Sequence, residues 1–276
     1  MKKIKVMVNG MPGKVACNIG AHILSDDRFE LIGHSLTGAE VVEAEYQINH
    51  AAIRLIRPDV RDTLIEELKK TNGPFISVDF TLPVAVNDNA KFYCRQNLPF
   101  VMGTTGGDRT LLEKTVNAAS ISAVIAPNMA KQIVGFQAMM AYAAENFPNL
   151  FNGYTLEIKE SHQSTKVDTS GTAKAMVGYF NKLGVNFTEN QIIKIRDPKI
   201  QQRDLGIPEE HLNGHGWHTY TLDSPDRTAQ FKFSHNINGR DIYAWGTFDA
   251  ISFLQKKIES EKKGRVYTMI DVLKGT

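Results

Sequence analysis

Cysteine is scarce in this sequence, and other features are missing whose absence narrows the class of protein. Only Cys17 and Cys94 occur among 276 residues, so a disulfide framework is excluded and a reducing compartment is expected. No apolar run approaches the ~18 residues of a membrane span. The apolar stretch after Met1-Lys2-Lys3 is too short for a signal peptide, so we expect a cytoplasmic protein.

Charge of one sign is also lacking, because 32 lysines and arginines face 30 aspartates and glutamates. This balance provides no basic surface for nucleic acid or for a membrane, and we expect neither partner. Hydrophobic residues make up 42% of the chain and charged residues 22%, which is ordinary for a globular protein. A length of 276 residues is sufficient for two domains.

A glycine turn follows the first apolar stretch. Residues 4–8 are expected to form a buried strand, residues 15–24 a helix and residues 29–34 a second strand. The turn between the first strand and the helix has the spacing G-x-x-G-x-x-A, with Gly10, Gly13 and Ala16. Glycines here let backbone N–H groups approach a pyrophosphate. A plain glycine turn is the alternative, but the position after the first strand favours a dinucleotide site with contacts from Gly10, Met11, Pro12, Gly13, Lys14 and Val15.

The region expected to face the cofactor ribose lacks the carboxylate typical of NAD-specific folds. About 20 residues after the turn, the sequence reads His34-Ser35-Leu36-Thr37-Gly38, with no acidic residue before Glu40. Hydroxyl groups together with Lys14 suit a 2′-phosphate, so NADPH is favoured over NADH, with Ser35 as a cofactor contact. Lys14 can alternatively be a solvated helix residue.

Strands and helices continue to alternate up to residue 126. This pattern predicts an α/β fold with a Rossmann-type, doubly wound parallel sheet. Ligands of such sheets bind beyond the carboxyl ends of the strands. The turns at those ends are therefore further candidates for cofactor binding, and they contain Phe80, Thr81, Gly103, Thr104, Thr105, Ala126, Pro127, Asn128 and Met129.

The pattern changes after residue 130. Strands are expected at 155–159, 192–196, 216–222, 228–234 and 241–244, with a helix at 172–183 among them. They predict a smaller α+β domain with a mixed, mostly antiparallel sheet over residues 130–245. Helices are expected at 246–261 and 265–273, and they would return to the first domain, which would then comprise residues 1–129 plus about 246–276.

One polar segment, Glu160 to Thr172, combines groups able to bind an anion and to transfer a proton. His162 and Lys166 precede Ser170-Gly171-Thr172, which stands where the 172–183 helix should begin. A serine or threonine cap and the free N–H groups of a helix start form an anion site. Histidine exchanges a proton near neutral pH. The segment therefore suits a carboxylate-bearing substrate that needs a proton, although a capped helix after a polar loop is an equal alternative.

A cluster of histidines at 211, 215 and 218 is not expected to bind a metal. These residues occur in a glycine-rich region without cysteine or carboxylate partners at ligand spacing. We therefore expect no metal site.

These motifs together resemble the 4-hydroxy-tetrahydrodipicolinate reductase (dihydrodipicolinate reductase) family. The resemblance rests on Gly10-Met11-Pro12-Gly13-Lys14, Asp79-Phe80-Thr81, Gly103-Thr104-Thr105-Gly106, and above all His162, Lys166-Val167-Asp168 and Ser170-Gly171-Thr172. It covers essentially the whole chain. Gln163 stands where most bacterial members have a second histidine, and the proline usual before Ser-Gly-Thr is missing, so the chain is similar to the plant-like branch.

The resemblance implies an NAD(P)H-dependent reductase of lysine (diaminopimelate) biosynthesis. Its substrate would be a small cyclic dicarboxylate, 4-hydroxy-tetrahydrodipicolinate, reduced by hydride transfer with loss of water. His162 and Lys166 would be the acid groups, and Thr105, Gln163, Lys166, Ser170, Gly171 and Thr172 would contact the substrate. A homo-oligomer, dimer or tetramer, is also implied. Another two-domain NAD(P)-dependent dehydrogenase of amino-acid metabolism, or a non-catalytic NADP(H)-binding redox sensor, remain alternatives.

Overall fold

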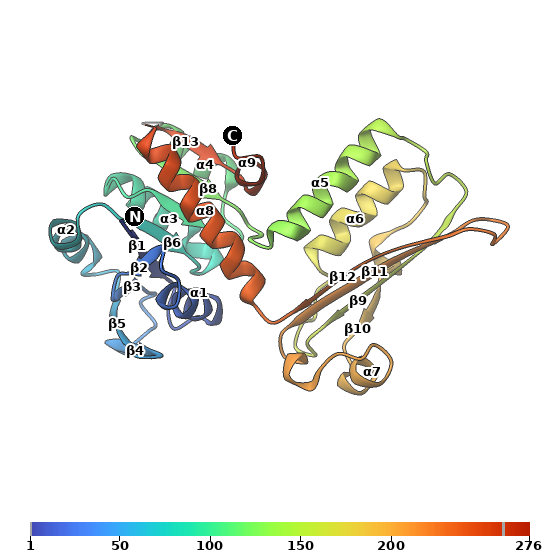
Figure 1. Ribbon diagram of the computed structural model, residues 1–276, viewed down its shortest axis with the longest axis horizontal. Coiled ribbons are helices and arrows are strands. Elements are labelled where there is room, and N and C mark those ends of the chain that lie inside the picture. Colours follow the sequence, from blue (N-terminus) through green and yellow to red (C-terminus); the bar gives the residue numbers. More distant parts are fainter. Residues whose placement is uncertain (1, 261–262) are drawn as a thin grey trace. The chain divides into compact units, whose positions relative to one another are not determined.

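Two compact units make up the protein in the computed structural model, which describes residues 2–260 and 263–276 (Figure 1). The first unit combines the chain up to Lys131 with the part from Asp241 onward, and the second unit is Gln132–Arg240. The first unit is therefore discontinuous in sequence, and the second is continuous.

A six-stranded parallel sheet forms the centre of the first unit, with the strand order β13-β8-β7-β6-β1-β2. Every residue of β6, β7 and β8 is buried, as expected for a parallel sheet covered on both faces. The predicted Rossmann-type fold is therefore confirmed. The strands are β1 (Ile4–Asn9), β2 (Phe29–Leu31), β6 (Ile76–Asp79), β7 (Phe100–Met102), β8 (Ser122–Ile125) and β13 (Arg265–Tyr267).

Helices pack on this sheet because their apolar residues recur at helical spacing. In α8, Ala244, Phe248, Ile251 and Leu254 are buried, so one stripe of the helix faces the core. α1 packs beside α8, and α3 packs beside α4. The helices are α1 (Lys14–Leu24), α2 (Arg61–Asn72), η1 (Pro83–Ala85), α3 (Val86–Arg95), α4 (Arg109–Asn117), α8 (Asp241–Glu259) and α9 (Met269–Lys274). A small sheet, β3-β5-β4, adds β3 (His34–Leu36), β4 (Glu45–Ile48) and β5 (Ala51–Ile56).

The second unit has a four-stranded sheet in the order β10-β9-β11-β12. β10 pairs with β9 in parallel, and the other two pairings are antiparallel, so the predicted mixed, mostly antiparallel sheet is confirmed. Figure 1 shows α5 and α6 together on one face of this sheet, above a core that includes Ile158, Phe180 and Tyr220. The elements are α5 (Lys131–Asn146), β9 (Thr155–His162), α6 (Gly171–Lys182), η2 (Glu189–Gln191), β10 (Ile193–Ile195), α7 (Pro198–Arg203), η3 (Glu209–His211), β11 (His215–Asp223) and β12 (Gln230–Asn238).

Two expectations about the C-terminal third are wrong. Residues 241–244, expected as a strand, form the first turn of α8, because Ala244 begins the buried stripe that continues through Phe248. The helix expected at 265–273 begins instead as the edge strand β13, and α9 follows it. Residue 261, the expected end of the preceding helix, lies outside the described residues.

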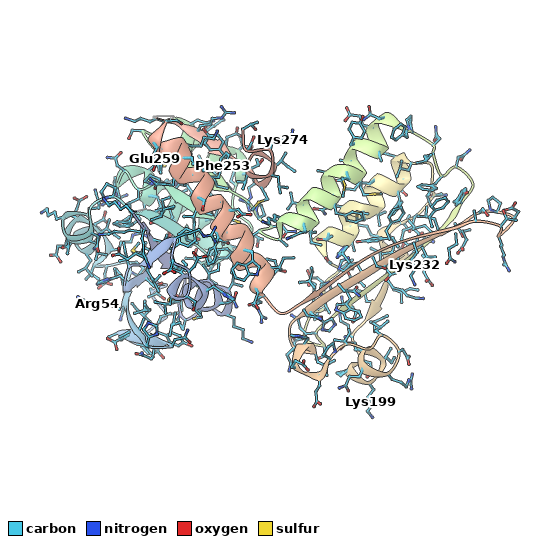
Figure 2. All side chains as sticks on the ribbon, viewed as in Figure 1. Arg54, Lys199, Lys232, Phe253, Glu259 and Lys274 are labelled. Atoms are coloured by element: carbon cyan, nitrogen blue, oxygen red, sulfur yellow. The ribbon has the colours of Figure 1, made fainter. Side chains whose placement is uncertain are left out.

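Charged side chains are distributed over the surface of both units. Figure 2 shows Arg54 on β5, Lys199 on α7 and Lys232 on β12 extending outward, and all three are exposed. Among residues 2–260 and 263–276, the helices are too short or too polar to cross a bilayer.

Candidate functional site

The first glycine turn adopts a backbone that excludes side chains at two positions. Gly10 has φ +104°, and a Cβ there would lie 2.2 Å from the carbonyl oxygen of Phe80. At Gly13 a Cβ would lie 2.7 Å from the carbonyl oxygen of Gly10. Gly13 is the N-cap of α1, so the first N–H groups of this helix lack partners within the helix itself. This is the geometry in which a helix start binds phosphate.

A cavity of about 460 Å³ opens at this turn, a size typical of small-molecule sites. Six predicted cofactor contacts line it: Gly10, Met11, Pro12, Gly13, Phe80 and Thr81. The segment expected to face the ribose also lines it, through Leu36, Thr37 and Gly38, although Ser35 was the contact chosen there. The sequence interpretation missed other lining residues, including Arg61 and Asn89. Arg61 lies at the start of α2, and its guanidinium stands 4.4 Å from the centre of the Phe92 ring. Arg61 lies 48 residues after Gly13, so no short sequence motif indicated that it would line this cavity.

Asp79, at the end of β6, is the centre of a buried hydrogen-bond network beside this cavity. Its buried carboxylate accepts hydrogen bonds from the Tyr93 hydroxyl at 2.7 Å, Asn89 Nδ2 at 3.0 Å, Thr104 Oγ1 at 2.6 Å and Thr81 Oγ1 at 2.9 Å. Burial and the Asp79 charge raise the pKa of Tyr93 well above its usual range, so this hydroxyl remains a donor. Thr104 therefore supports the cavity wall without lining it.

Other predicted cofactor contacts lie outside this cavity. Ser35 is buried, and its hydroxyl accepts a hydrogen bond from the Met11 N–H at 3.2 Å, so it stabilises the turn. Lys14 is exposed on α1 and Val15 is half-buried. The remaining residues follow the carboxyl ends of β7 and β8, at the same edge of the parallel sheet: Gly103, Thr105, Ala126, Pro127, Asn128 and Met129.

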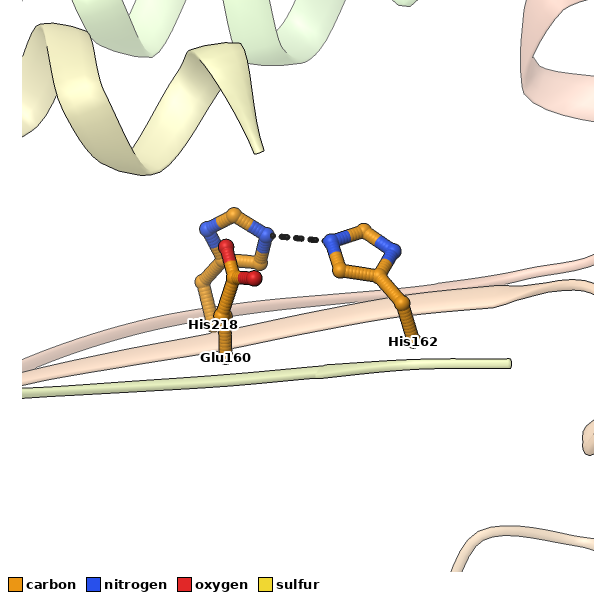
Figure 3. A group of neighbouring side chains, drawn as sticks. All are labelled: Glu160, His162 and His218. Atoms are coloured by element: carbon orange, nitrogen blue, oxygen red, sulfur yellow. Dashed lines mark hydrogen bonds between the residues drawn. The ribbon is translucent and has the colours of Figure 1, made fainter. Parts of the chain in front are cut away.

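In the second unit, neighbouring strands bring acid–base side chains together. β9 and β11 pair so that His218 lies opposite Glu160, and Gly216 lies opposite His162. Figure 3 shows Glu160, His162 and His218 on the same face of these strands. One nitrogen or oxygen atom from each lies within 4.8 Å of the other two. We interpret this group as a hydrogen-bonded cluster and not as a metal site, because the Glu160 carboxylate already has two protein donors.

Those donors are Arg196 and the Ser170 backbone. The Arg196 guanidinium forms a short ion pair with Glu160, which is completely buried, and the Ser170 N–H donates to the other carboxylate oxygen at 3.0 Å. Arg196 also donates to the backbone carbonyls of Lys166 at 2.8 Å and Asp168 at 3.4 Å. It therefore fastens the loop between β9 and α6 to the sheet.

Both ring nitrogens of His162 have protein partners. Nδ1 donates to the His215 carbonyl at 3.1 Å, and Nε2 lies 3.1 Å from Nε2 of His218. Burial lowers the pKa of His162 to about 4, and the nearby Glu160 charge offsets part of this effect. The imidazole is therefore neutral at pH 7. Gly216 gives the ring its space, because a Cβ there would stand 3.0 Å from Cε1 of His162.

Lys166 and the start of α6 complete the group predicted from the sequence. Lys166 Nζ donates to Asp168 at 2.6 Å, and this hydrogen bond together with the Lys166 charge lowers the pKa of that exposed carboxyl. Ser170 is the N-cap of α6, with its Oγ accepting from the Thr172 N–H at 3.2 Å. Since the Ser170 N–H is taken by Glu160 and the Thr172 N–H by Ser170 Oγ, the Gly171 N–H and the Thr172 hydroxyl are the better placed groups for a carboxylate. Gln163 is half-buried, and its carbonyl accepts from the Lys166 N–H at 3.0 Å.

Several members of this cluster were not predicted from the sequence. Arg196 and His218 are 34 and 56 residues from His162, so only strand pairing brings them near. Gln201 of α7 is also buried, and its Nε2 donates to the His162 carbonyl at 2.7 Å. The available signal was the two-residue alternation of Glu160 with His162, and of His218 with Tyr220, which places each pair on one face of its strand.

A Rossmann-type unit with a glycine-turn cavity and a second unit with clustered acid–base groups define the class of two-domain nicotinamide-dependent reductases. Comparisons with known proteins are more specific. Models for the dihydrodipicolinate reductase N-terminus and C-terminus match residues 4–129 and 133–273. The chain therefore belongs to the dihydrodipicolinate reductase family, and the resemblance stated from the sequence is confirmed.

Individual relatives agree with this assignment. The chain is 47% identical over 269 residues to the probable 4-hydroxy-tetrahydrodipicolinate reductase 1, chloroplastic, of Oryza sativa subsp. japonica, covering 98% of this chain and 78% of the relative. It is 47% identical over 273 residues to 4-hydroxy-tetrahydrodipicolinate reductase 2, chloroplastic, of Arabidopsis thaliana, covering 98% and 77%. The plant-like character is thus confirmed. The fold matches dipicolinate-bound dihydrodipicolinate reductase from Paenisporosarcina sp. TG-14, with a TM-score of 0.68, 18% identity, and coverage of 97% and 98%.

Proposed function

We propose that this protein reduces 4-hydroxy-tetrahydrodipicolinate to tetrahydrodipicolinate with NAD(P)H and releases water, as a reductase of the diaminopimelate route to lysine. The observation that carries this proposal is the single loop from β9 to α6. That loop presents His162, Lys166 and the N-terminus of α6 in a unit matched by the family model. A dicarboxylate substrate needs a cationic side chain and backbone donors, and this loop supplies both.

The first unit has the features needed to bind the cofactor. Gly10 and Gly13 clear the backbone around the N-terminus of α1, which suits a pyrophosphate, and the cavity between Thr37, Arg61 and Phe80 can take the adenosine half. Bound NAD(P)H would supply the hydride. The turns after β7 and β8, with Gly103, Thr104, Thr105 and residues 126–129, would contact the cofactor further along the same edge of the sheet.

We assign a preference for NADPH to Arg61. Arg61 lines the cavity and its guanidinium carbon lies 4.4 Å from the centre of the Phe92 ring, so a rigid cationic group is available for a 2′-phosphate. Glu40 lines the same cavity and could hydrogen-bond an unphosphorylated ribose, so NADH would also be accepted. Lys14, the cation considered from the sequence, is exposed and does not line the cavity.

The second unit would bind the substrate and provide the proton. As hydride reaches the ring, electron density moves toward the ring nitrogen, and a proton must be supplied. Lys166 is the direct donor in this proposal, since among residues 2–260 and 263–276 its ammonium group pairs with Asp168 alone, whereas both nitrogens of His162 have protein partners. His162 orients the substrate and shares the acid role. Gly171 and Thr172 hold one carboxylate at the helix start, with Gln163 as a neutral contact.

A homo-oligomer, dimer or tetramer, and a reducing compartment such as the cytoplasm are part of the proposal. Cys17 and Cys94 are both free thiols, which suits a reducing environment. Burial raises the pKa of each and so lowers its reactivity. Light scattering coupled to size-exclusion chromatography would test the assembly, and a monomer at micromolar concentration would contradict it. Fractionation of the source cells would test the compartment.

The decisive experiment is turnover of freshly generated 4-hydroxy-tetrahydrodipicolinate with NADPH, followed by absorbance of the reduced cofactor. Lys166→Ala should lower kcat by about 10²–10⁴-fold, the usual contribution of a general acid, and leave NADPH binding unchanged. Lys174→Ala on α6 is the matched control, because that lysine pairs with Glu189 instead. Turnover on a different imino or keto acid, or binding of NADPH without any turnover, would refute the proposal.

A further inference from the structure

A continuous chain of hydrogen bonds extends from His162 to the edge strand of the second sheet. Nε2 of His162 lies 3.1 Å from Nε2 of His218, and Nδ1 of His218 lies 3.0 Å from the Tyr220 hydroxyl. That hydroxyl lies 3.3 Å from Nε2 of His235. The rings of His218 and His235 also stack, with their centres 4.6 Å apart. Three adjacent strands, β9, β11 and β12, thus each contribute to the chain.

One fixed acceptor sets the direction of every bond in this chain. The His215 carbonyl can only accept, so Nδ1 of His162 carries the hydrogen and its Nε2 accepts in the neutral ring. His218 must then donate from Nε2 and accept at Nδ1 from the Tyr220 hydroxyl. The Tyr220 oxygen in turn accepts from Nε2 of His235, which leaves Nδ1 of His235 as an acceptor. This Nδ1 is buried and has no hydrogen-bond partner among residues 2–260 and 263–276 of the protein.

The surroundings keep all members of the chain neutral. Burial lowers the pKa of His218 to about 2 and that of His235 to about 4, and it raises the pKa of Tyr220. α5 contributes an apolar ring, Phe136, which meets His235 edge to face at 5.9 Å. The charged groups near the chain come from β9, the residue after β10 and the loop before α6, namely Glu160, Arg196 and Lys166.

We propose that His218, Tyr220 and His235 are positioning residues that hold Nε2 of His162 and let this imidazole become cationic when the dicarboxylate binds. The inference rests on the proposed function. It follows because a dianionic ligand beside the β9–α6 loop favours positive charge at the His162 end of the chain, and the chain provides a route for one proton to reach it.

One proton can be relayed along the hydrogen-bond chain with every proton accounted for and without rotation of any histidine ring. Nδ1 of His235 is buried, so the half-buried side chain must first open to solvent at the edge strand β12. A hydronium ion then gives a proton to this Nδ1, and His235 passes the proton on its Nε2 to the Tyr220 oxygen. Tyr220 passes its original proton to Nδ1 of His218, and His218 passes the proton on Nε2 to Nε2 of His162. His162 is then an imidazolium with both nitrogens protonated, the other three groups are neutral, and one water remains from the hydronium.

The first test is nitrogen NMR of the protein labelled with ¹⁵N-histidine. In the free wild-type protein, His162 should carry its hydrogen on Nδ1, and His218 and His235 should carry theirs on Nε2. Addition of pyridine-2,6-dicarboxylate, a flat mimic of the substrate, should convert His162 to the imidazolium at pH 7. Tyr220→Phe removes one hydroxyl from the middle of the chain, so His218 should lose its fixed tautomer and His162 should stay neutral with the mimic bound.

Kinetics supply the second test. Tyr220→Phe should lower kcat about 10–100-fold, less than loss of a direct general acid, with the KM for NADPH unchanged and the acidic limb of the kcat profile displaced. Tyr154→Phe is the matched control, because its ring packs against Phe151 and Phe231 away from the chain. His235→Asn breaks the chain at the half-buried edge strand and should reproduce the effect even if Tyr220→Phe folds poorly.

Unchanged histidine tautomers and an unchanged pH profile in both chain variants would overturn the proposal. Failure of the proposed function is a separate result: the wild-type protein would then not turn over 4-hydroxy-tetrahydrodipicolinate, and the mimic would not bind, whereas the tautomers of the free protein would still report on the chain.

Discussion

Replacing Arg196 by methionine should destabilise the second unit more than any ordinary surface substitution. Glu160 has no exposed side-chain surface, and Arg196 is its only cationic partner among the ion pairs of the described residues. Methionine keeps much of the aliphatic volume but leaves the carboxylate buried without its counter-charge. Breaking such a pair from one side costs about 3–5 kcal/mol. Arg196 also fastens the carbonyls of Lys166 and Asp168, so the loss falls at the upper part of that range.

Urea unfolding followed by Trp217 fluorescence can measure this loss. Trp217 lies on β11 in the second unit, and a Trp245→Phe background removes the signal of the first unit. Arg203→Met is the matched control, because Arg203 pairs with Asp204 at the surface, with 75% and 46% of the two side chains exposed. Such exposed pairs contribute about 0–1 kcal/mol.

A double variant separates the charge from the lost contacts. Glu160→Gln combined with Arg196→Met leaves no uncompensated charge, so it should be more stable than Arg196→Met alone. If Arg196→Met lowers the free energy of unfolding no more than Arg203→Met does, the ion pair does not organise the β9–α6 loop. The same conclusion follows if the double variant shows the full sum of the two single losses.

Two further outcomes are expected. Burial lowers the pKa values of His162, His218 and His235, so the unfolded chain binds more protons than the folded one between about pH 6.5 and 4. The free energy of unfolding should therefore fall with decreasing pH, by up to about 1.4 kcal/mol per pH unit for each histidine. Equal urea midpoints at pH 7.5 and 5.5 would contradict this. Arg61→Ala should raise the KM for NADPH about 10–100-fold, because a charged hydrogen bond is lost, and should change the KM for NADH little. Lys14→Ala should change neither KM. An equal effect of Arg61→Ala on both cofactors would exclude a role of Arg61 in binding the 2′-phosphate.

Local sequence patterns were sufficient for much of the architecture. The strand, glycine turn and helix from Ile4 to Leu24 are encoded by neighbouring residues, and Gly10 lies where its φ of +104° demands glycine. Period-two alternation correctly predicted the central strands of the second sheet. The segment around residue 241 misled because its aromatic residues suit a strand, and only packing against the first sheet makes the stripe from Ala244 to Phe248 helical.

The site was predicted only where its residues are close together in sequence. His162, Lys166 and Ser170 could be grouped because they occupy one loop. Arg196 and His218 could not be, since their proximity depends on the register of β10 and β11 against β9, which no short segment encodes. Arg61 was not predicted for the same reason. It lies at the start of α2, and most of the residues that line its cavity come from other parts of the first unit.

The discontinuity of the first unit has a consequence for synthesis on the ribosome. Its edge strand β13 and its covering helix α8 are translated after the whole of Gln132–Arg240, so the parallel sheet stops at β8 until residues 265–267 have been made. All four strands of the second sheet precede residue 241, so this sheet can form before the last strand of the first sheet has been made. A chain that ended at Arg240 would therefore contain every strand of the second sheet but would lack β13 and α8 of the first unit, with the apolar partners of Phe248 and Ile251 uncovered.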